Sequence, residues 1–580
     1  MKLDDTIMKR INEWTHKPYM DDCIKDITSL VDEKNENELN ERFGAELEFG
    51  TGGLRGIIRN GTNGMNIYNV AKATQGIANY IKKCGIQNPK AVVAYDSRIF
   101  SKEFADETAL IFASNGIKTY LFSEMRPTPT LSFAIRHLGC ATGVVITASH
   151  NPKEYNGYKA YWSDGAQMIN PHDTAVITEV RAITSMNDVK KENFYNLVAN
   201  GMIEIIDEEV DNAFLNEIYK LSINPEIANG SNVKIVFTPI HGTGATLIPK
   251  LFKKLGLNNV LYVKEQMIPD GKFPTVKKPN PEEKEALQRG INLAKKENAD
   301  IVIATDPDAD RMGIAVKDKN GNFNIISGNH IGAIIEYYLL SELKKKNKLP
   351  ANGAVVKTIV TTNLQDDIGA FFGVKVFNVL TGFKYIGEKI KHFETDKNYQ
   401  YLCGGEESYG FLVGTHARDK DAIVASMLIA ECCAVLQKEG KNLDDYLTEI
   451  LTQFGFYDDK TVSIDIPGLK GQEIIAGIMA HYKATPRKEF AHIKVTKAID
   501  FNTDKVADAA GSTYILPPSN VIQYHLEDGS KISLRPSGTE PKIKFYFSVK
   551  GKSKEDAINK LNDFSKDLQT EVEGLIKKAL

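Results

Sequence analysis

Short apolar runs rich in β-branched residues alternate with longer amphipathic stretches from about residue 66 to residue 450. Short continuous apolar runs are typical of buried strands, and the stretches between them show the apolar spacing of helices. Strands that alternate with helices form α/β units around largely parallel sheets. The pattern therefore predicts an α/β fold over most of the chain.

The predicted strands recur in three pairs, and a polar loop follows the second strand of each pair. The pairs are 91–94 with 144–146, 233–237 with 301–304, and 354–357 with 401–403. The pairs suggest an internal threefold repeat. Because residue-level similarity between them is weak, the alternative is that this spacing arises by chance, as it can in any α/β protein. We expect three similar α/β domains with mixed, largely parallel sheets.

The C-terminal part has a different pattern. Residues 531–534 and 542–547 alternate apolar and polar side chains, as half-exposed antiparallel strands do. Ser553 and Asp556 resemble a capping box that opens a final amphipathic helix. We expect an α+β domain here, and the four domains at residues 1–205 (with an N-terminal helical extension), 206–325, 326–455 and 456–580.

Composition excludes some classes of function. The 580 residues suffice for roughly three to five domains. Lys plus Arg number 72 and Asp plus Glu 75, a net charge of -3, which gives no basic field for nucleic acid or an anionic membrane. The six cysteines show no paired CxxC spacing, and the N-terminus has no apolar signal core. We expect a cytoplasmic protein without nucleic-acid or membrane partners.

A candidate nucleophile follows the apolar run 144–146. The hexapeptide 147–152, TASHNP, delivers Ser149 to a loop directly after this predicted strand. Such a serine is placed to carry a covalent group. The alternative is a turn hydroxyl that bonds its own backbone.

A candidate metal site follows the run 301–304. Asp306, Asp308 and Asp310 alternate in a loop, where their oxygens can converge on one hard cation such as Mg²⁺. An EF-hand is excluded because Arg311 and Lys317 stand where that loop needs Gly and Glu. A solvated acidic turn is the remaining alternative.

Three further loops carry polar groups suited to a phosphorylated sugar. Glu406 and Ser408, in 404–410, offer acceptors for hydroxyl groups, although a simple turn explains them equally well. Residues 535–542 offer Arg535 with hydroxyls and a glycine, a pattern that suits phosphate better than an ordinary hairpin. The glycine-rich segment 51–56 presents Arg55, a weak signal on its own.

In chain order, the motifs TASHNP, DPDADR, GEESYG and RPSGTEP resemble those of the α-D-phosphohexomutase superfamily. The resemblance extends over about residues 44–550 and is strongest to the longer bacterial, phosphoglucomutase-2-like phosphoglucomutase branch. It implies four domains around a central cleft, with one motif loop from each domain.

The resemblance also implies roles for individual residues. Ser149 is the expected phosphoserine, and its phosphate with Asp306, Asp308 and Asp310 is expected to hold Mg²⁺. Lys159 matches the lysine that exchanges the proton of the substrate hydroxyl, although a surface lysine is the alternative and a base needs a lowered pKa. The other expected site residues are Arg55 and His150 beside the phosphoserine, Glu406 and Ser408 on sugar hydroxyls, Arg535, Ser537, Gly538 and Thr539 on the phosphate that is not transferred, and Lys384, Arg418 and Arg311 as further substrate contacts.

The activity implied is interconversion of glucose 1-phosphate and glucose 6-phosphate through glucose 1,6-bisphosphate, which is both intermediate and activator. The expected partners are small-molecule sugar phosphates, and the expected state is a monomer or weak homodimer. Mannose or pentose phosphates remain alternative substrates. The residues also leave open a phosphatase with an aspartate nucleophile, a non-catalytic sugar-phosphate-binding protein, and a serine hydrolase, although the absence of a GxSxG elbow disfavours the hydrolase.

Overall fold

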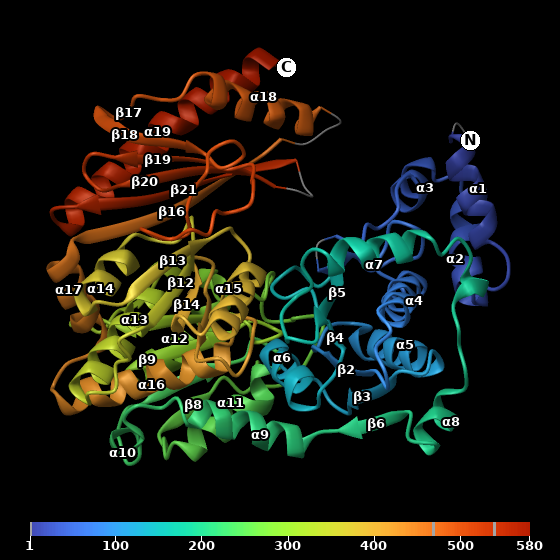
Figure 1. Cartoon of the computed structure of the whole chain (residues 1–580), viewed down its shortest axis with the longest axis horizontal. Helices are drawn as coiled ribbons and strands as arrows, with labels where there is room; N and C mark the ends of the chain where they lie inside the picture. Colours follow the sequence, from blue (N-terminus) through green and yellow to red (C-terminus); the bar gives the residue numbers. More distant parts are fainter. Residues whose placement is uncertain (1–2, 51, 467–469, 538–540, 580) are drawn as a thin grey trace. The chain divides into compact units, whose positions relative to one another are not determined.

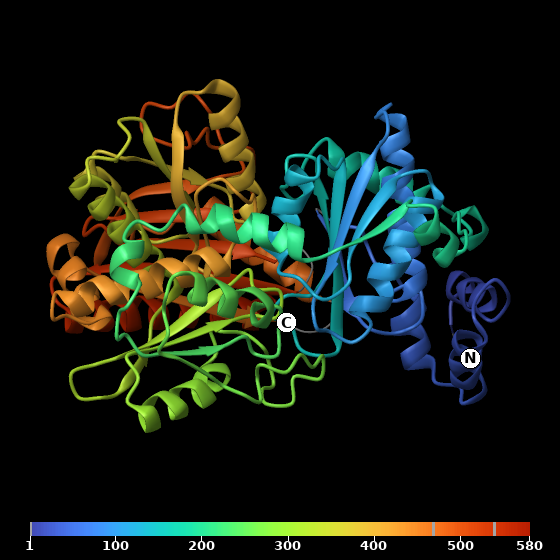
Figure 2. The same cartoon turned by 90° about the horizontal axis from the view of Figure 1, so that it is seen from below.

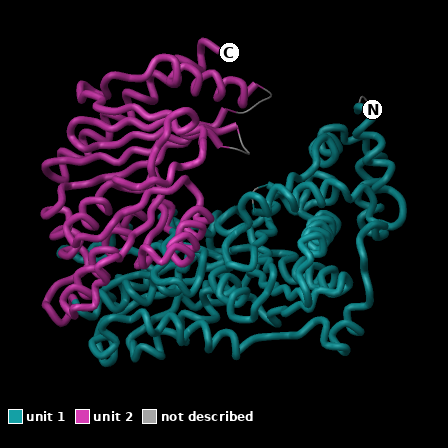
Figure 3. Tube along the Cα trace, in the orientation of Figure 1, with its two compact units in different colours: residues 1–325, 410–435 teal, residues 326–409, 436–580 magenta. Residues whose placement is uncertain are grey.

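The computed structural model describes residues 3–50, 52–466, 470–537 and 541–579. The chain forms two compact units, residues 1–325 with 410–435 and residues 326–409 with 436–580 (Figure 3). Each unit is described by itself. The central cleft expected from the sequence stays a prediction, as do the four domain boundaries.

The first unit begins with three helices, α1 (Asp5–Trp14), α2 (Asp21–Asp32) and α3 (Glu36–Phe43), shown in dark blue in Figure 1. The side chain of Asp4 caps α1 by accepting hydrogen bonds from two backbone N–H groups. Trp14 stacks on Tyr19 with ring centroids 4.4 Å apart, and both rings contact Tyr68 of the following domain. Aromatic burial therefore fixes this extension to the first domain.

The first sheet has the strand order β1-β5-β4-β2-β3-β6. Its centre is parallel, and β5 and β1 add antiparallel strands at one edge. The connection β2-α5-β3 moves toward one edge of the sheet, and the connection β3-α6-β4 moves back toward the other. Because both crossovers are right-handed, α5 and α6 lie on opposite faces of the sheet (Figures 1 and 2). The elements are β1 (Gly53–Ile57), α4 (Ile67–Lys83), β2 (Lys90–Tyr95), α5 (Ser101–Ser114), β3 (Lys118–Phe122), α6 (Thr128–His137), β4 (Thr142–Ile146), β5 (Tyr155–Trp162), α7 (His172–Arg181), α8 (Phe194–Ala199) and β6 (Ile203–Ile206).

The second sheet has the order β11-β10-β9-β7-β8 and repeats this plan. β7 pairs in parallel with β8 and β9, while β10 and β11 are antiparallel. Every residue of β9 is buried, because helices and neighbouring strands cover the centre of the sheet. The elements are α9 (Glu208–Tyr219), α10 (Pro225–Ala228), β7 (Ile235–Thr238), α11 (Gly244–Lys254), β8 (Val260–Tyr262), α12 (Lys284–Glu297), β9 (Ile301–Thr305), β10 (Met312–Lys317) and β11 (Phe323–Ile325).

The first unit also takes in β15 (Gly410–Val413) and most of α16 (Ala422–Lys438). The buried carboxylate of Glu431 interrupts the apolar sequence of α16 and accepts hydrogen bonds from the hydroxyl of Ser222 and the N–H of Ile223. A buried carboxylate needs such donors. Within the described ranges, no helix combines the length and apolar character needed to cross a bilayer.

The second unit contains the third α/β domain and the C-terminal domain. β12 pairs in parallel with β13 and β14, and the antiparallel sheet that follows has the order β16-β21-β20-β19-β18-β17. The predicted α/β class and the α+β C-terminal domain are thus confirmed. The elements are α13 (Gly328–Lys345), β12 (Gly353–Thr358), α14 (Leu364–Phe372), β13 (Lys375–Val379), α15 (Phe383–Asp396), β14 (Gln400–Glu406), α17 (Leu443–Phe454), β16 (Phe456–Asp465), α18 (Gly471–Ala484), β17 (Glu489–Phe490), β18 (Ile493–Asp500), β19 (Ile522–Leu526), β20 (Lys531–Pro536), β21 (Lys542–Gly551) and α19 (Lys554–Ala579).

The final helix α19 covers the C-terminal sheet. It packs on β16 and β21, and the hydroxyl of Ser553 accepts the N–H of Asp556 at 3.1 Å at its start. Phe564 is fully buried in the core between helix and sheet, whereas Ile558 of the same helix is exposed. The helix therefore attaches to the sheet through one apolar face.

Phe564→Ala should destabilise the C-terminal domain by about 3–5 kcal/mol, because it removes a buried ring and leaves a cavity. Ile558→Ala, the control on the same helix, should change stability by at most about 0.5 kcal/mol. Scanning calorimetry checks both variants. An equal effect of the two substitutions would contradict this packing.

Candidate active site

Ser149 lies in a constrained loop three residues after the end of β4. Its backbone has a φ of 52°, a left-handed conformation that is uncommon for serine. The side chain is buried, and its Oγ donates to Asp306 Oδ2 at 2.6 Å and lies 3.2 Å from His150 Nδ1. The loop therefore delivers the hydroxyl directly to the acidic loop of the second domain.

Arg98 holds this loop in place from behind. Its guanidinium donates to the backbone carbonyls of Ser149 and Asn151 at 2.5 Å, Pro152 at 2.9 Å and Tyr155 at 3.0 Å. The planar fork of an arginine can serve several carbonyl groups at once, which a lysine cannot do. The surrounding backbone is thus fixed by one buried side chain.

Asp96 balances the charge of Arg98. Both side chains are buried, with Arg98 Nε 3.3 Å from Asp96 Oδ2. The same carboxylate accepts the hydroxyl of Thr147 at 2.6 Å, and that hydroxyl oxygen accepts the N–H of Ser149 at 2.8 Å. A continuous chain of hydrogen bonds therefore links Asp96 to Ser149.

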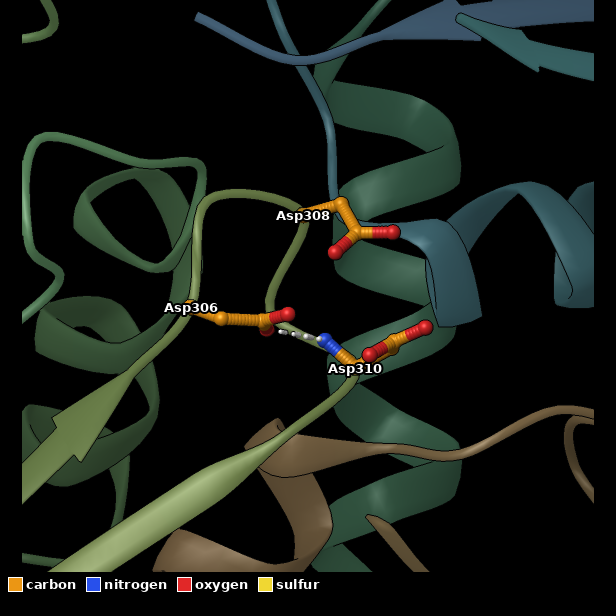
Figure 4. Close-up of side chains that lie close together, drawn as sticks. All are labelled: Asp306, Asp308 and Asp310. Atoms are coloured by element: carbon orange, nitrogen blue, oxygen red, sulfur yellow. Dashed lines mark hydrogen bonds between the residues drawn. The ribbon is translucent and has the colours of Figure 1, made fainter. Parts of the chain in front are cut away.

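The three aspartates converge in the loop between β9 and β10 (Figure 4). Asp306, Asp308 and Asp310 are buried, and one carboxylate oxygen from each lies within 4.8 Å of the others. Asp306 Oδ1 accepts the N–H of Asp310 at 3.1 Å and of Arg311 at 3.0 Å. Burial and the two neighbouring carboxylates raise the pKa of Asp306 well above its usual value.

The donor set fits a hard divalent cation. Asp308 Oδ1 and Asp310 Oδ1 are buried and have no hydrogen-bond partner among the described residues. Buried carboxylate oxygens without donors are costly unless a cation serves them. Three carboxylate oxygens suit Mg²⁺, which completes its shell with water or phosphate oxygens. The loop is a metal-binding triad.

Two lysines lie beside this triad. Lys159 Nζ, on β5, is 2.8 Å from Asp308 Oδ2 and 3.0 Å from Asp310 Oδ2. Burial opposes the charge of Lys159, but the two carboxylates outweigh it and raise its pKa. Lys420 Nζ lies 3.2 Å from Asp310 Oδ2 and 2.9 Å from Asp419 Oδ1. Lys159 is therefore no surface lysine, and Lys420 is a second cation that sequence reasoning missed.

Thr128 joins the first two domains at the same point. Its N–H donates to the carbonyl of Asp308 at 2.9 Å, and its hydroxyl donates to Asp308 Oδ2 at 2.7 Å. Thr128 opens α6, and its backbone and side-chain donors both serve the acidic loop. No sequence pattern indicated this contact, because it joins residues 180 positions apart.

The other expected residues of the first unit surround Ser149. Burial, then Arg311 and Arg55, lower the pKa of His150 well below its usual value, so its imidazole is neutral. Arg311 forms an ion pair with Glu282 at 2.9 Å. Arg55 lies on the edge strand β1 and is exposed. Arg55 and Arg311 both act electrostatically on His150, the neighbour of Ser149.

Arg418 is surrounded by hydrogen-bonding groups of its own loop and of α6. It is buried, and its guanidinium donates to the backbone carbonyls of Thr415 and Ala417. Its own N–H donates to the hydroxyl of Ser132 at 2.8 Å. Arg418 thus stabilises the loop that carries Lys420, and its expected substrate contact stays a prediction.

In the second unit, Glu406 ends β14 and is buried. Its Oε1 accepts the N–H of Gly382 at 3.0 Å, which joins the end of β14 to the segment that carries Lys384. Ser408 lies in the half-exposed turn that follows. The structure therefore brings together Glu406 and the start of α15, two segments that the sequence predicted as substrate contacts.

The C-terminal loop begins at Arg535 on β20. The N–H of Ser537 donates to the carbonyl of Lys542 at 2.7 Å, which closes the turn between β20 and β21. Gly538 and Thr539 lie outside the described residues. Burial and the carboxylates Glu407 and Glu406 raise the pKa of Tyr546 to about 12 against the opposing effect of Arg535. Tyr546 therefore interacts electrostatically with Glu407, Arg535 and Glu406, which no sequence pattern indicated.

Comparison with known proteins finds matching domain families and similar sequences. Four domain families of phosphoglucomutase/phosphomannomutase match residues 46–187 (α/β/α domain I), 212–321 (α/β/α domain II), 327–454 (α/β/α domain III) and 490–561 (C-terminal domain). A phosphoglucomutase of Staphylococcus haemolyticus is 38% identical over 535 residues, which cover 92% of this chain and 95% of that protein. A phosphoglucomutase of Staphylococcus epidermidis is 36% identical over 541 residues, 93% and 97% of the two chains.

Solved structures share the fold. The open form of Paramecium parafusin, a phosphoglucomutase, superposes with a TM-score of 0.67 at 17% identity and covers 92% of this chain and 95% of its own. A phosphoglucomutase/phosphomannomutase family protein of Burkholderia thailandensis gives a TM-score of 0.63 at 18% identity, with 91% and 98% covered. At these identities the likeness concerns the fold.

Arg98→Lys should loosen the Ser149 loop, because an ammonium group cannot serve four carbonyls. We expect backbone amides around residues 147–155 to exchange with deuterium at least 10-fold faster, measured by mass spectrometry. Arg181→Lys, at an exposed arginine, is the control and should leave exchange unchanged. Unaltered exchange in Arg98→Lys would show that the guanidinium is dispensable.

Asp308→Asn should weaken divalent-cation binding at least 10-fold, because it removes one of three charges from the triad. Titration with Mn²⁺, followed by electron paramagnetic resonance, measures this affinity. Asp318→Asn is the control: it lies in the exposed turn after β10 and removes the same single negative charge as Asp308→Asn. It should bind Mn²⁺ as the unaltered protein does. Equal affinities of the two variants would contradict a metal site at the triad.

Proposed function

Because the chain belongs to the phosphoglucomutase/phosphomannomutase family, we propose that it interconverts glucose 1-phosphate and glucose 6-phosphate. It is an intramolecular phosphotransferase of the isomerase class. The observation that carries the proposal is the 2.6 Å hydrogen bond from Ser149 Oγ to Asp306, which places the serine hydroxyl at the metal-binding triad.

Ser149 acts as the phosphoryl carrier in this proposal. The bond between phosphorus and Ser149 Oγ breaks as a bond forms to the free hydroxyl oxygen of the substrate, whose proton leaves. The product of this half-reaction is glucose 1,6-bisphosphate. Its other phosphoryl group then returns to Ser149, which regenerates the phosphoserine and releases the isomeric monophosphate.

Charge neutralisation is the main requirement, because transfer of a phosphoryl group depends on positioning and electrostatic stabilisation more than on a strong nucleophile. Asp306, Asp308 and Asp310 would hold Mg²⁺, which supplies positive charge to the phosphoryl oxygens when bound. Arg55, Arg311 and the neutral His150 surround the serine and add donors.

Lys159 is the proposed group that exchanges the hydroxyl proton. It is buried beside the triad, and its ammonium hydrogens face the carboxylates of Asp308 and Asp310. Burial opposes the charge of Lys159, but the carboxylates of Asp308 and Asp310 outweigh burial and raise its pKa, so the group rests as an ammonium. A cation on the same carboxylates would oppose that effect and leave Lys159 able to accept the proton in one half-reaction and return it in the other.

The second unit supplies substrate recognition in this proposal. Glu406 and Ser408 bind sugar hydroxyls, and Arg535 and Ser537, with Gly538 and Thr539, bind the phosphate that is not transferred. Lys384 of the same unit and Arg418 of the first unit are further substrate contacts. The partners are small-molecule sugar phosphates, and we propose a cytoplasmic monomer or weak homodimer.

The preference for glucose rests on the names of the relatives and on the GEESYG form of the sugar loop. A mannose or pentose phosphate is the competing substrate within the same reaction. Comparison of kcat/KM for glucose, mannose and ribose 1-phosphates decides between them. A higher value for mannose or ribose would overturn the glucose assignment and leave the mutase reaction intact.

Ser149→Ala should lower turnover at least 1,000-fold in an assay that couples glucose 6-phosphate to NADPH formation, because no oxygen remains to carry the phosphoryl group. Mass spectrometry of the unaltered protein should locate a phosphate on Ser149. Ser163→Ala, at an exposed serine, is the control and should retain full activity. Activity retained by Ser149→Ala would point instead to an aspartate nucleophile, as in a phosphatase.

A further inference from the structure

The second unit contains a cavity that none of the proposed catalytic residues lines. Its volume is about 440 Å³, within the range of about 300–1,000 Å³ typical of small-molecule sites. One wall comes from the third domain, with Ile359 and Asn363 after β12 and Asn378 within β13. The opposite wall comes from the C-terminal sheet, with Lys497 on β18 and Lys531 on β20.

The acidic groups of the cavity are already neutralised. Asp366 Oδ2 lies 2.9 Å from Lys357 Nζ, and Asp367 Oδ2 lies 2.8 Å from Lys550 Nζ. Asp367 Oδ2 also accepts the hydroxyl of Tyr457 at 2.8 Å. These carboxylates therefore leave little negative charge for other lysines.

Within the described part of the chain, the positive charges of two further lysines, Lys531 and Lys497, are not paired with a carboxylate in this way. Lys531 is buried and donates to the carbonyl of Thr361 at 2.7 Å, whereas Lys497 of the same wall is exposed. Across the described residues, neither ammonium has a carboxylate within ion-pair distance. A buried ammonium without a counter-ion is unfavourable.

His525, another lining residue, responds to this excess of positive charge. Burial, then Lys531, Lys497 and Lys357, lower its pKa to about 4. Its Nε2 lies 3.1 Å from Gln523 Oε1, so the neutral ring donates to an amide. The cavity is therefore cationic, with neutral amide and hydroxyl groups between the charges.

We propose that this cavity is a second ligand site, separate from the Ser149 site, that binds a small polyanion carrying phosphoryl or carboxylate groups. Lys531 and Lys497 would neutralise its charge. Asn363, Asn378 and the hydroxyl of Tyr457 would bind its polar groups, and apolar side chains such as Ile499 would cover its carbon atoms. A ligand on both walls joins the third domain to the C-terminal domain.

The site is distinct from the C-terminal phosphate loop. Lys531 begins β20 and Arg535 lies four residues further along the same strand, so their side chains share one face of the sheet. At about 3.4 Å per residue, the two positions are about 14 Å apart. Arg535 does not line the cavity, so an anion inside the cavity contacts Lys531 without Arg535.

Binding should be linked to protonation of Lys531. Burial, then Lys357, lower the pKa of Lys531 to about 7. A bound anion favours the charged ammonium and raises this pKa, so binding at pH 8 should take up protons. The charged and titratable groups around Lys531 are Lys357 of β12, Asp366 and Asp367 of α14, Glu407 after β14, Asp459 of β16, Lys497 of β18, His525 of β19 and Lys550 of β21.

Isothermal titration calorimetry of the full chain with inorganic pyrophosphate tests the site. Lys531→Gln should weaken binding at least 10-fold and abolish proton uptake, measured in two buffers of different ionisation enthalpy. Lys497→Gln, an exposed substitution that leaves folding intact, should weaken binding at least 3-fold. In Arg535→Gln the binding that depends on Lys531 should persist. Lys494→Gln, at an exposed lysine of the same strand as Lys497, should bind as the unaltered protein does.

A parallel titration with citrate identifies the chemistry. Tighter binding of pyrophosphate assigns the site to phosphoryl groups, and tighter binding of citrate assigns it to carboxylates. The proposal is overturned if the unaltered protein binds neither anion, if Arg535→Gln abolishes binding, or if Lys497→Gln and Lys531→Gln both bind as the unaltered protein does. If Lys531→Gln does not fold, Lys497→Gln decides.

Discussion

The dominant constraint on the first unit is the burial of three carboxylates in one short loop. Isolated buried carboxylates are strongly unfavourable, so Asp306, Asp308 and Asp310 require donors and cations from elsewhere in the chain. The hydroxyl of Ser149 and the ammonium group of Lys159 meet this need. The interactions that stabilise the loop are therefore the same ones that place the proposed phosphoryl carrier, Ser149, and the proposed proton-exchanging group, Lys159, beside it.

The sheets explain how distant segments reach this loop. Ser149 follows the carboxyl end of the parallel strand β4, and Asp306 follows that of β9. Residues at such strand ends lie in loops outside the regular hydrogen bonds of the sheet, where side chains are available for ligands. Lys159 instead lies within the antiparallel β5, where it pairs with Val145 of β4 and is held at a fixed register from the loop. A rigid strand and a constrained loop thus meet at one point.

The strands and polar loops could be predicted from the sequence, because strand burial leaves continuous apolar runs and loops interrupt them. Ser149 and the aspartates could be identified because they follow such runs directly. Arg98 and Lys420 could not, since an arginine that serves backbone carbonyls leaves no pattern in its own neighbourhood and Lys420 lies in a charged segment that resembles a surface. The resemblance alone suggests Arg418 as a substrate contact, whereas its hydrogen bonds to the carbonyls of Thr415 and Ala417 could not be predicted, because they depend on how this loop folds.

The hydrogen bonds at Ser149 and Thr128 join residues 157 and 180 positions apart in the chain. Contacts of such long sequence separation form late in folding, after local elements and individual domains are in place. During synthesis, the first domain is complete well before Asp306 leaves the ribosome. The hydroxyl of Ser149 therefore has no partner from the acidic loop until the second domain has been synthesised and has docked on the first.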